Sequence, residues 1–122
     1  MDEFWTRHFT PDEFRCPCCN KLPKDLLLLG NLLFMLEKLR TMLGDKPIII
    51  NSGFRCVKHN KEIGGVSNSQ HLRGAAADIV VPGAVIKKLG CVCEDVGFSG
   101  IGIYSTWVHV DVREGPHARW TY

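Results

Sequence analysis

The sequence lacks any hydrophobic run long enough to cross a lipid bilayer. Its longest uninterrupted apolar stretches are Leu26–Leu29 and Leu32–Leu36, whereas a membrane-spanning helix needs about 20 apolar residues. Residues Met1–Thr10 also lack the basic start and the apolar core of an export signal. We therefore expect a chain that is made in the cytosol without a signal peptide, that has no membrane partner, and that needs help to act outside the cell.

A strong excess of charge of one sign is also lacking. The formal net charge is +2, and acidic and basic residues are mixed along the chain. Proteins that bind nucleic acid present a basic face or stripe, so we expect no nucleic-acid partner. The sequence shows no internal repeat, and its 122 residues are the length of one domain. We therefore predict a single domain over residues 1–122, and we expect it to act as a monomer.

Cysteine is abundant by contrast. The six residues are Cys16, Cys18, Cys19, Cys56, Cys91 and Cys93. Disulfides are uncommon in cytosolic proteins. A structural zinc site is the alternative, but one residue separates Cys16 from Cys18 and Cys91 from Cys93, and zinc-binding pairs are usually separated by two to four. We therefore favour free thiols that are partly buried as small apolar groups.

Local signals predict a short helix near the start of the chain. Thr10 and Glu13 form a capping box, and the proline between them suits the first helical position. Phe9 and Phe14 flank this turn at the positions of a hydrophobic staple. The helix should end before Pro17.

The remaining pattern predicts helices and strands in alternation. A long helix should lie between Pro23 and Gly44, and a second from about Ala84 to Val96. The long helix should bury a leucine stripe: Leu29, Leu32, Leu33, Leu36, Leu39 and Leu43. We interpret four segments as strands: Pro47–Ile50, Ala75–Val81, Gly100–Tyr104 and Trp107–Arg113. The predicted fold is α+β, with helices packed on one face of a small, mostly antiparallel sheet.

The polar segment 51–75 and the strand after it hold the first candidate functional residues. A long loop rich in Gly, Asn and Ser is usually functional in a compact domain. His71 lies in this loop, and Asp78 interrupts the apolar strand that follows. A buried carboxylate needs a cation or strong hydrogen-bond donors. Taken alone, Asp78 could instead form a salt bridge or a backbone cap, and His71 could be a solvated loop residue.

A third candidate lies on the last predicted strand. Side chains alternate across a strand, so Val108, Val110 and Val112 should face the core. The opposite face then carries Trp107, His109, Asp111 and Arg113. Two histidines and one carboxylate are a common ligand set of catalytic zinc, with a fourth position left for water. A zinc ion would also provide the cation that Asp78 requires.

These residues stand in an order that resembles a known family. Ser52-Gly-Phe-Arg55 is followed by His59-Asn60, by Gly64-Gly65, by Ser69-Gln-His-Leu-Arg-Gly-Ala-Ala-Ala-Asp78 and by His109. The pattern resembles the zinc D-Ala-D-Ala carboxypeptidase family, which includes the VanX dipeptidases and phage endolysin peptidases and shares its fold with the hedgehog signalling domain. The resemblance covers roughly residues 9 to 120, nearly the whole chain. It implies the hedgehog and D-Ala-D-Ala-peptidase type of α+β fold.

The resemblance also implies roles for individual residues. It implies a Zn²⁺ cofactor held by His71, Asp78 and His109. Arg55 would contact the substrate carboxylate or the developing oxyanion, which suits a planar cation beside a metal. Ser69 matches a position that hydrogen-bonds the substrate backbone. The plain alternatives are a surface arginine and an ordinary loop serine.

One position departs from the family pattern. Many members carry a glutamate as general base three residues before the last histidine, and this sequence has Thr106 there. Trp107 keeps the aromatic residue that often follows, and we count it among the substrate-binding residues. Asp111 is the first candidate for the missing base, although it could equally orient the imidazole of His109. His117 is the second candidate.

The leading hypothesis is a zinc peptidase that hydrolyses peptide bonds of the peptidoglycan stem. It would act either as a D-Ala-D-Ala carboxypeptidase or as an endopeptidase, with Asp111 as catalytic base and Arg55 stabilising the oxyanion. The missing export signal favours a phage or prophage lysis enzyme that reaches the cell wall after release. The rival hypothesis, which Thr106 supports, is a non-catalytic zinc domain that binds cell-wall peptide or serves in a phage particle.

Overall fold

The computed structural model describes residues 6–122. Residues 1–5, part of the stretch examined for an export signal, lie outside the described residues. The helices are α1 (Leu26–Met42), α2 (Val57–Glu62) and α3 (Ile86–Val96), and two short 3-10 helices are η1 (Pro11–Phe14) and η2 (Gln70–Arg73). The strands are β1 (Ile49–Ser52), β2 (Ala76–Val80), β3 (Gly100–Ile103), β4 (Val108–Asp111) and β5 (Ala118–Thr121).

The strands form a five-stranded sheet in the order β1-β2-β4-β3-β5. The pairs β1–β2, β2–β4 and β3–β4 are antiparallel, and β5 lies at the edge, parallel to β3. The predicted α+β fold with a small, mostly antiparallel sheet is therefore confirmed.

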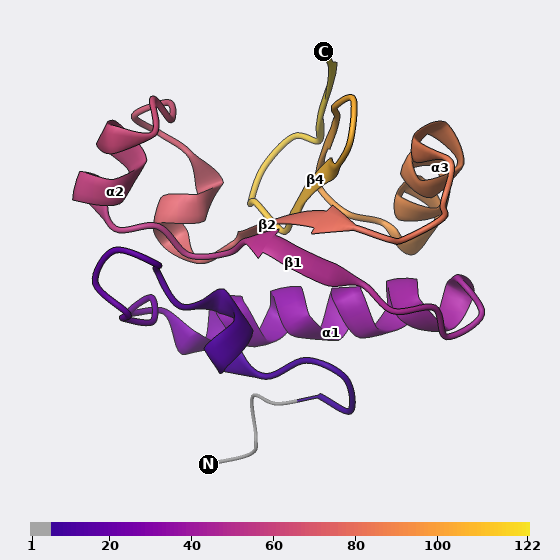
Figure 1. Cartoon of the computed structure of the whole chain (residues 1–122), viewed down its shortest axis with the longest axis horizontal. Coiled ribbons are helices and arrows are strands. Elements are labelled where there is room, and N and C mark those ends of the chain that lie inside the picture. The colour runs from indigo at the N-terminus through magenta and orange to yellow at the C-terminus, as the bar shows by residue number, and fades with distance from the viewer. Residues whose placement is uncertain (1–5) are drawn as a thin grey trace.

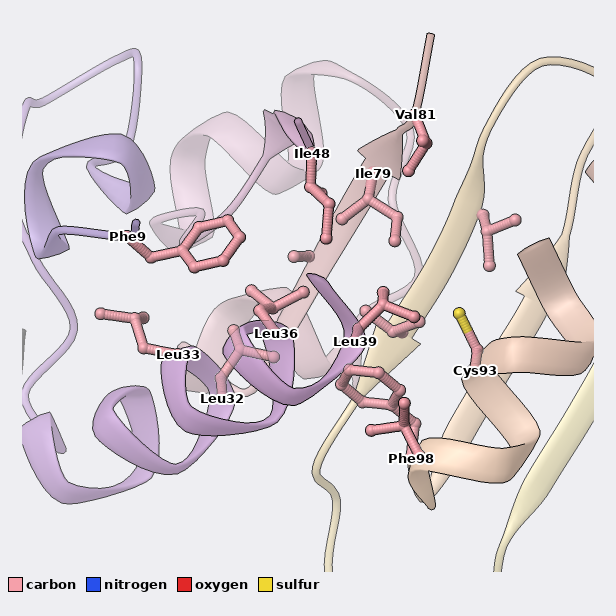
Figure 2. Packing of buried hydrophobic residues seen from close by; sticks show 14 of the residues in the cluster. Phe9, Leu32, Leu33, Leu36, Leu39, Ile48, Ile79, Val81, Cys93 and Phe98 are labelled. Atoms are coloured by element: carbon pink, nitrogen blue, oxygen red, sulfur yellow. The ribbon is translucent and has the colours of Figure 1, made fainter. Parts of the chain in front are cut away.

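The hydrophobic core lies between the sheet and helices α1 and α3. From α1, Leu32, Leu36 and Leu39 are fully buried, and they belong to one cluster with Ile79 of β2 and Cys93 of α3. Figure 2 shows these side chains converging between the helices and the strands. In Figure 1, α1 runs below β1 while α2 lies above it. The predicted leucine stripe thus faces the core, and the opposite face of the sheet is left for polar residues.

The N-terminal segment folds against this core much as its sequence predicts. The backbone N–H of Thr10 donates to the carboxylate of Glu13 at 2.9 Å, as a capping box requires. Phe9 and Phe14 are buried, so both aromatic residues of the predicted staple pack inward. The turn they enclose is the short 3-10 helix η1, which ends at Phe14 and so before Pro17.

Several element boundaries differ from the prediction. Helix α1 starts at Leu26 because Asp25 is its cap, with the N–H of Leu28 donating to the Asp25 carboxylate at 3.0 Å. Strand β1 extends to Ser52 because that residue pairs with Asp78. The segment 51–75 contains α2 and η2, and β5 was not predicted at all. Within residues 6–122, no helix has the length and apolar character that a membrane crossing would demand.

Candidate metal centre and its pocket

Pairing of the strands places the candidate site in one row across the sheet. Ser52 pairs with Asp78, Asp78 with His109, His109 with Gly102, and Gly102 with Trp120. Residues that are directly opposite in a sheet share a face. The neighbouring residues Ala77, Ile79, Val108 and Val110 face the core instead. Strand alternation therefore separates the core from the polar site, as the sequence predicts for β4.

The 3-10 helix η2 brings His71 to this row. The Ser69 hydroxyl accepts the N–H of His71 at 3.2 Å and so fixes the start of η2. Gly74 ends η2 with a φ of +75°, and a Cβ there would lie 2.4 Å from the Pro23 ring. Only glycine suits both constraints. The chain therefore turns directly from η2 into β2, and His71 meets Asp78 seven residues later.

The three predicted ligands converge on one carboxylate oxygen. Oδ1 of Asp78 lies 3.2 Å from Nε2 of His71 and 3.2 Å from Nδ1 of His109. One donor atom from each residue lies within 4.8 Å of the other two. His71 and His109 are buried, with relative exposures of 2% and 7%. The structure therefore brings together the residues that the sequence singled out.

Hydrogen bonds from behind orient both imidazoles. Nδ1 of His71 lies 2.7 Å from the carbonyl oxygen of Gly53, so this nitrogen carries the proton and donates. Nε2 of His109 lies 2.7 Å from Oδ2 of Asp111 and donates to it in the same way. The nitrogens that face Asp78 are then free to bind a cation. Such outer hydrogen bonds are typical of histidines that bind metals.

The spacing of the donor atoms suits zinc. Around a tetrahedral zinc ion with ligand distances of about 2.0–2.2 Å, neighbouring donor atoms are about 3.3–3.6 Å apart. The two distances of 3.2 Å to Asp78 are close to that range. Two imidazoles and one carboxylate also leave a fourth position for water or substrate. The residues present therefore fit a zinc ion in the chemistry and the spacing of their donor atoms.

Electrostatics of the cluster favour a cation. Burial opposes the ionised form of Asp78. Without a metal ion, His109 and His71 can each take a second proton and donate to this carboxylate, which outweighs burial and holds the pKa of Asp78 well below the usual value. Burial also opposes the charged form of His109, but Asp111 and Asp78 together raise its pKa. An ionised carboxylate is the correct form for a metal ligand, and a metal ion would take the place of the proton on His109.

Arg55 lies beside the metal cluster and is held by three partners. Its Nε donates to Ser52 Oγ at 3.2 Å, one terminal nitrogen donates to Asn60 Oδ1 at 3.2 Å, and the other donates to Asp78 Oδ2 at 3.3 Å. The Arg55 side chain is 12% exposed and lines the pocket. Arg55 therefore contacts the second oxygen of the carboxylate that the histidines share.

Asp111 lies behind His109, on the side away from Asp78. It is fully buried, and both of its oxygens accept hydrogen bonds. Oδ2 accepts from His109 and from a terminal nitrogen of Arg113 (2.7 Å each), and Oδ1 accepts from the N–H and Nε of Arg113 at 3.1 and 2.9 Å. These donors outweigh burial and keep the pKa of Asp111 well below its usual value. Of the other candidates, Thr106 and His117 are exposed and do not line the pocket, and His117 lies 3.4 Å from Arg119.

The site opens into a pocket of about 360 Å³, within the size range of small-ligand sites. One wall is aromatic: Tyr104, Trp107, Trp120 and Tyr122. Tyr104 stacks on Trp107 with ring centroids 4.5 Å apart and on Tyr122 at 4.9 Å. Trp120 donates to the Tyr104 hydroxyl at 3.0 Å, and its ring centroid lies 4.9 Å from that of His109. Ser69 also lines the pocket.

Of the four residues of the aromatic wall, the sequence predicted only Trp107 as a site residue. Trp120 and Tyr122 belong to or follow β5, and β5 pairs with β3 as a parallel strand. Parallel neighbours are not joined by a hairpin, so no local pattern connects these residues to the site. The two aromatic residues within Arg119–Tyr122 and the aromatic residue at the end of the predicted strand Gly100–Tyr104 were the available signals, and they are weak.

Two imidazoles and a carboxylate around one point of an open pocket form the ligand set of a metal-dependent hydrolase. The chain belongs to the Peptidase M15 family, which matches residues 7–111. It is also similar to the zinc D-Ala-D-Ala carboxypeptidase of Streptomyces albus G, with 49% identity over 47 residues. That match covers 38% of this chain and 18% of the relative's length. The predicted membership of this peptidase family is therefore confirmed.

Proposed function

We propose that the protein is a zinc peptidase that hydrolyses peptide bonds in the stem peptides of bacterial peptidoglycan. His71, Asp78 and His109 would hold the zinc ion. The observation that carries this proposal is the convergence of both imidazoles on one oxygen of Asp78 at 3.2 Å, each ring oriented by a hydrogen bond from behind. Membership of the Peptidase M15 family supports the reaction class.

When bound, zinc would make a water molecule acidic enough to ionise near neutral pH and would polarise the carbonyl of the scissile bond. The described residues that line the pocket include no carboxylate other than Asp78. We therefore assign Asp111 the orienting role, because it lies behind His109 and both of its oxygens are occupied. The protein would then position the zinc ion and the substrate and supply the positive charge of Arg55. It would do so without a carboxylate base at the position of Thr106.

Arg55 would bind negative charge on the substrate. A guanidinium group has five N–H donors, and Arg55 uses three of them on Ser52, Asn60 and Asp78. Two donors are left at the edge of the pocket. They suit a terminal carboxylate or the oxyanion that develops on the attacked carbonyl. The first choice corresponds to removal of a terminal D-Ala, and the second also serves cleavage inside the stem peptide.

The aromatic wall would bind the rest of the peptide. Trp107 and Tyr104 present a stacked pair of rings to the pocket, and Ser69 offers a hydroxyl close to the metal ligands. Flat rings cover the apolar faces of small side chains such as alanine, while a hydroxyl pairs with backbone amides. The name of the Streptomyces relative, zinc D-Ala-D-Ala carboxypeptidase, agrees with such a substrate. The phage lysis setting stays a prediction from the sequence.

The test measures zinc and hydrolysis together. Purified protein is incubated with peptidoglycan and with a synthetic stem pentapeptide ending in D-Ala-D-Ala, with and without a chelator, and released amino groups are counted. We expect chelator-sensitive release. His71→Ala and His109→Ala should each lose activity and one equivalent of zinc, whereas His117→Ala, changed at an exposed histidine outside the pocket, should lose neither.

The outcomes separate the two hypotheses. Unchanged zinc content in both ligand variants would contradict the ligand assignment. Zinc that is bound by the wild type and lost in these variants, with no release from any substrate, would favour the non-catalytic domain that the Thr106 departure suggests. Release from the pentapeptide alone identifies a carboxypeptidase, and release from intact peptidoglycan alone identifies an endopeptidase.

A further inference from the structure

A second cluster of metal-binding side chains lies outside the histidine site. The thiols of Cys16, Cys19 and Cys56 all lie within 4.8 Å of one another, and they share no residue with the His71 cluster. Among the described cysteines none is in a disulfide. Two of the three thiols belong to the turn after η1, and the third immediately precedes α2. Cys56 therefore lies 40 positions after Cys16 in the sequence.

The pair that the fold selects has the spacing of a zinc-binding turn. Cys19, and not Cys18, is the residue whose thiol lies close to that of Cys16, so the short spacing of Cys16 and Cys18 does not count against a metal site. Two residues separate Cys16 from Cys19, as in common structural zinc sites. The turn is closed by backbone hydrogen bonds, with Asn20 N–H donating to Cys16 O at 2.7 Å and Cys16 N–H donating to Lys21 O at 3.0 Å.

Backbone N–H groups point at the sulfur atoms. The N–H of Cys56 donates to Sγ of Cys16 at 3.4 Å, and the N–H of His59 donates to Sγ of Cys56 at 3.4 Å. Such contacts stabilise negative charge on sulfur, and thiolates are the form that binds zinc. Burial would raise the pKa of Cys16, but N–H groups of Cys56, Cys19 and Cys18 outweigh it and lower that pKa to about 7.

The neighbouring thiols show the opposite effect. The Lys21 N–H favours the thiolate of Cys19, but burial and the thiols of Cys16 and Cys56 outweigh it and raise the pKa. Burial and the Cys56 thiol raise the pKa of Cys18. Several thiolates so close together repel one another unless a cation lies between them. Cys16 is therefore the thiol of the cluster that ionises most easily. A bound metal ion would favour ionisation of the neighbouring thiols as well.

We propose that Cys16, Cys19 and Cys56 bind a second zinc ion, with a structural role. Around tetrahedral zinc with Zn–S distances of about 2.3 Å, sulfur atoms lie about 3.8 Å apart. In the structure the three sulfur atoms lie within 4.8 Å of one another, so each sulfur–sulfur distance would have to shorten by at most about 1 Å. The fourth position of the tetrahedron would be open to water or to the thiol of the neighbouring, exposed Cys18, which lies outside the group of three.

The ion would fix the segment that presents Arg55. Cys56 directly follows Arg55, and Phe54 N–H donates to Phe14 O at 2.9 Å. A Cβ on Gly53 would lie 2.8 Å from the Phe14 backbone, so the N-terminal segment and the end of β1 are in close contact. A zinc ion shared by the turn after η1 and by Cys56 would join these two segments. The cysteine site thus stands apart from the peptidase proposal, although it would support the same pocket.

The test counts zinc by native mass spectrometry after purification in zinc-containing buffer. We expect two zinc ions per wild-type chain. Cys19→Ser, changed at an exposed position, should keep only the zinc ion at the histidine site. His71→Ala should keep only the zinc ion at the cysteine site. Cys91→Ser is the matched control, because Cys91 is an exposed cysteine on α3 outside the cluster, and it should keep two.

Cobalt substitution identifies the ligands independently of activity. Cobalt-loaded His71→Ala should retain the near-ultraviolet charge-transfer band of thiolate ligands, and cobalt-loaded Cys19→Ser should have lost most of its intensity. X-ray absorption spectroscopy at the zinc edge of His71→Ala should show sulfur ligands at a Zn–S distance of about 2.3 Å. The proposal is overturned if Cys19→Ser keeps the full zinc content, or if peptide mapping of the native protein finds a disulfide between Cys56 and either cysteine of the turn.

Discussion

At the scale of single residues, the candidate metal centre depends on which nitrogen of each histidine faces Asp78. His71 turns Nε2 toward the carboxylate and His109 turns Nδ1, because Gly53 and Asp111 accept the proton of the other nitrogen. The sequence singled out these three residues as candidate ligands, since a carboxylate in an apolar strand needs a cation. It could not identify these orientations, because they depend on two acceptors, Gly53 just after β1 and Asp111 of β4, that only the fold brings to the histidines.

Replacing Asp111 with asparagine tests the orienting role. Both oxygens of Asp111 accept hydrogen bonds, from His109 and from Arg113. The amide nitrogen of an asparagine cannot accept a hydrogen bond, so it would leave a donor of His109 or Arg113 without an acceptor. We expect Asp111→Asn to weaken zinc binding about 10- to 100-fold, measured by competition with a chromophoric chelator. Asp95→Asn, an exposed position on α3, is the control and should bind zinc normally. Unchanged zinc affinity with reduced turnover would instead identify Asp111 as the proton acceptor.

At the scale of elements, strand β3 makes room for the site by having no side chains on that face. Gly100 and Gly102 lie opposite Asp111 and His109. A Cβ on Gly100 would lie 2.1 Å from Oδ2 of Asp111, and a Cβ on Gly102 would lie 2.3 Å from the Trp120 ring. The site side chains of β4 and β5 therefore lean over β3. The alternation of glycine and isoleucine in β3 is a requirement of packing at the metal centre.

A methyl group on β3 should therefore impair metal binding at a distance. We expect Gly100→Ala to push the Asp111 carboxylate off His109 and to lower zinc affinity by about tenfold or more, as loss of an orienting contact does. The same chelator competition measures it. Gly90→Ala in α3 is the control, because its Cβ would meet only the flexible end of Ile103. It should leave zinc affinity unchanged, and an equal loss in both variants would contradict the explanation.

Some of the helices and strands could be predicted from the sequence, and others could not. β2, β3, β4 and α3 were predicted within a few residues, because apolar periodicity and glycine boundaries mark them locally. The helices inside segment 51–75 were missed, since α2 has only Asn60 buried and so lacks an apolar stripe. Strand β5 was missed because its partner β3 is distant and parallel. With β5, the sequence also missed the part of the pocket wall that Trp120 and Tyr122 form.

At the scale of the whole molecule, the core and the candidate metal centre lie on opposite faces of one sheet. The buried cluster that joins α1, α3 and the strands contains none of the three candidate ligands. Leu36 is fully buried in it and labelled in Figure 2. Changes on one face should therefore leave the other intact, apart from their common dependence on a folded sheet.

Leu36→Ala tests this separation. The cavity should lower the free energy of unfolding by about 2–5 kcal/mol, measured by urea denaturation in the presence of chelator. Added zinc should then stabilise the variant and the wild type by the same amount, because distant sites act additively and binding stabilises only the folded state. A smaller zinc effect in the variant would show that the core and the site are energetically coupled.

The edge position of β5 has a consequence for the order in which the site can be assembled. A chain leaves the ribosome from its N-terminus onward, and residues up to Asp111 already hold both histidines and Asp78. The strand that carries Trp120 emerges afterwards and can only pair with the exposed edge of β3. The nascent protein thus has the three candidate ligands before it has the part of the pocket wall that Trp120 and Tyr122 form. During biosynthesis, the residues of the candidate metal centre are therefore all present before the pocket beside it can be completed.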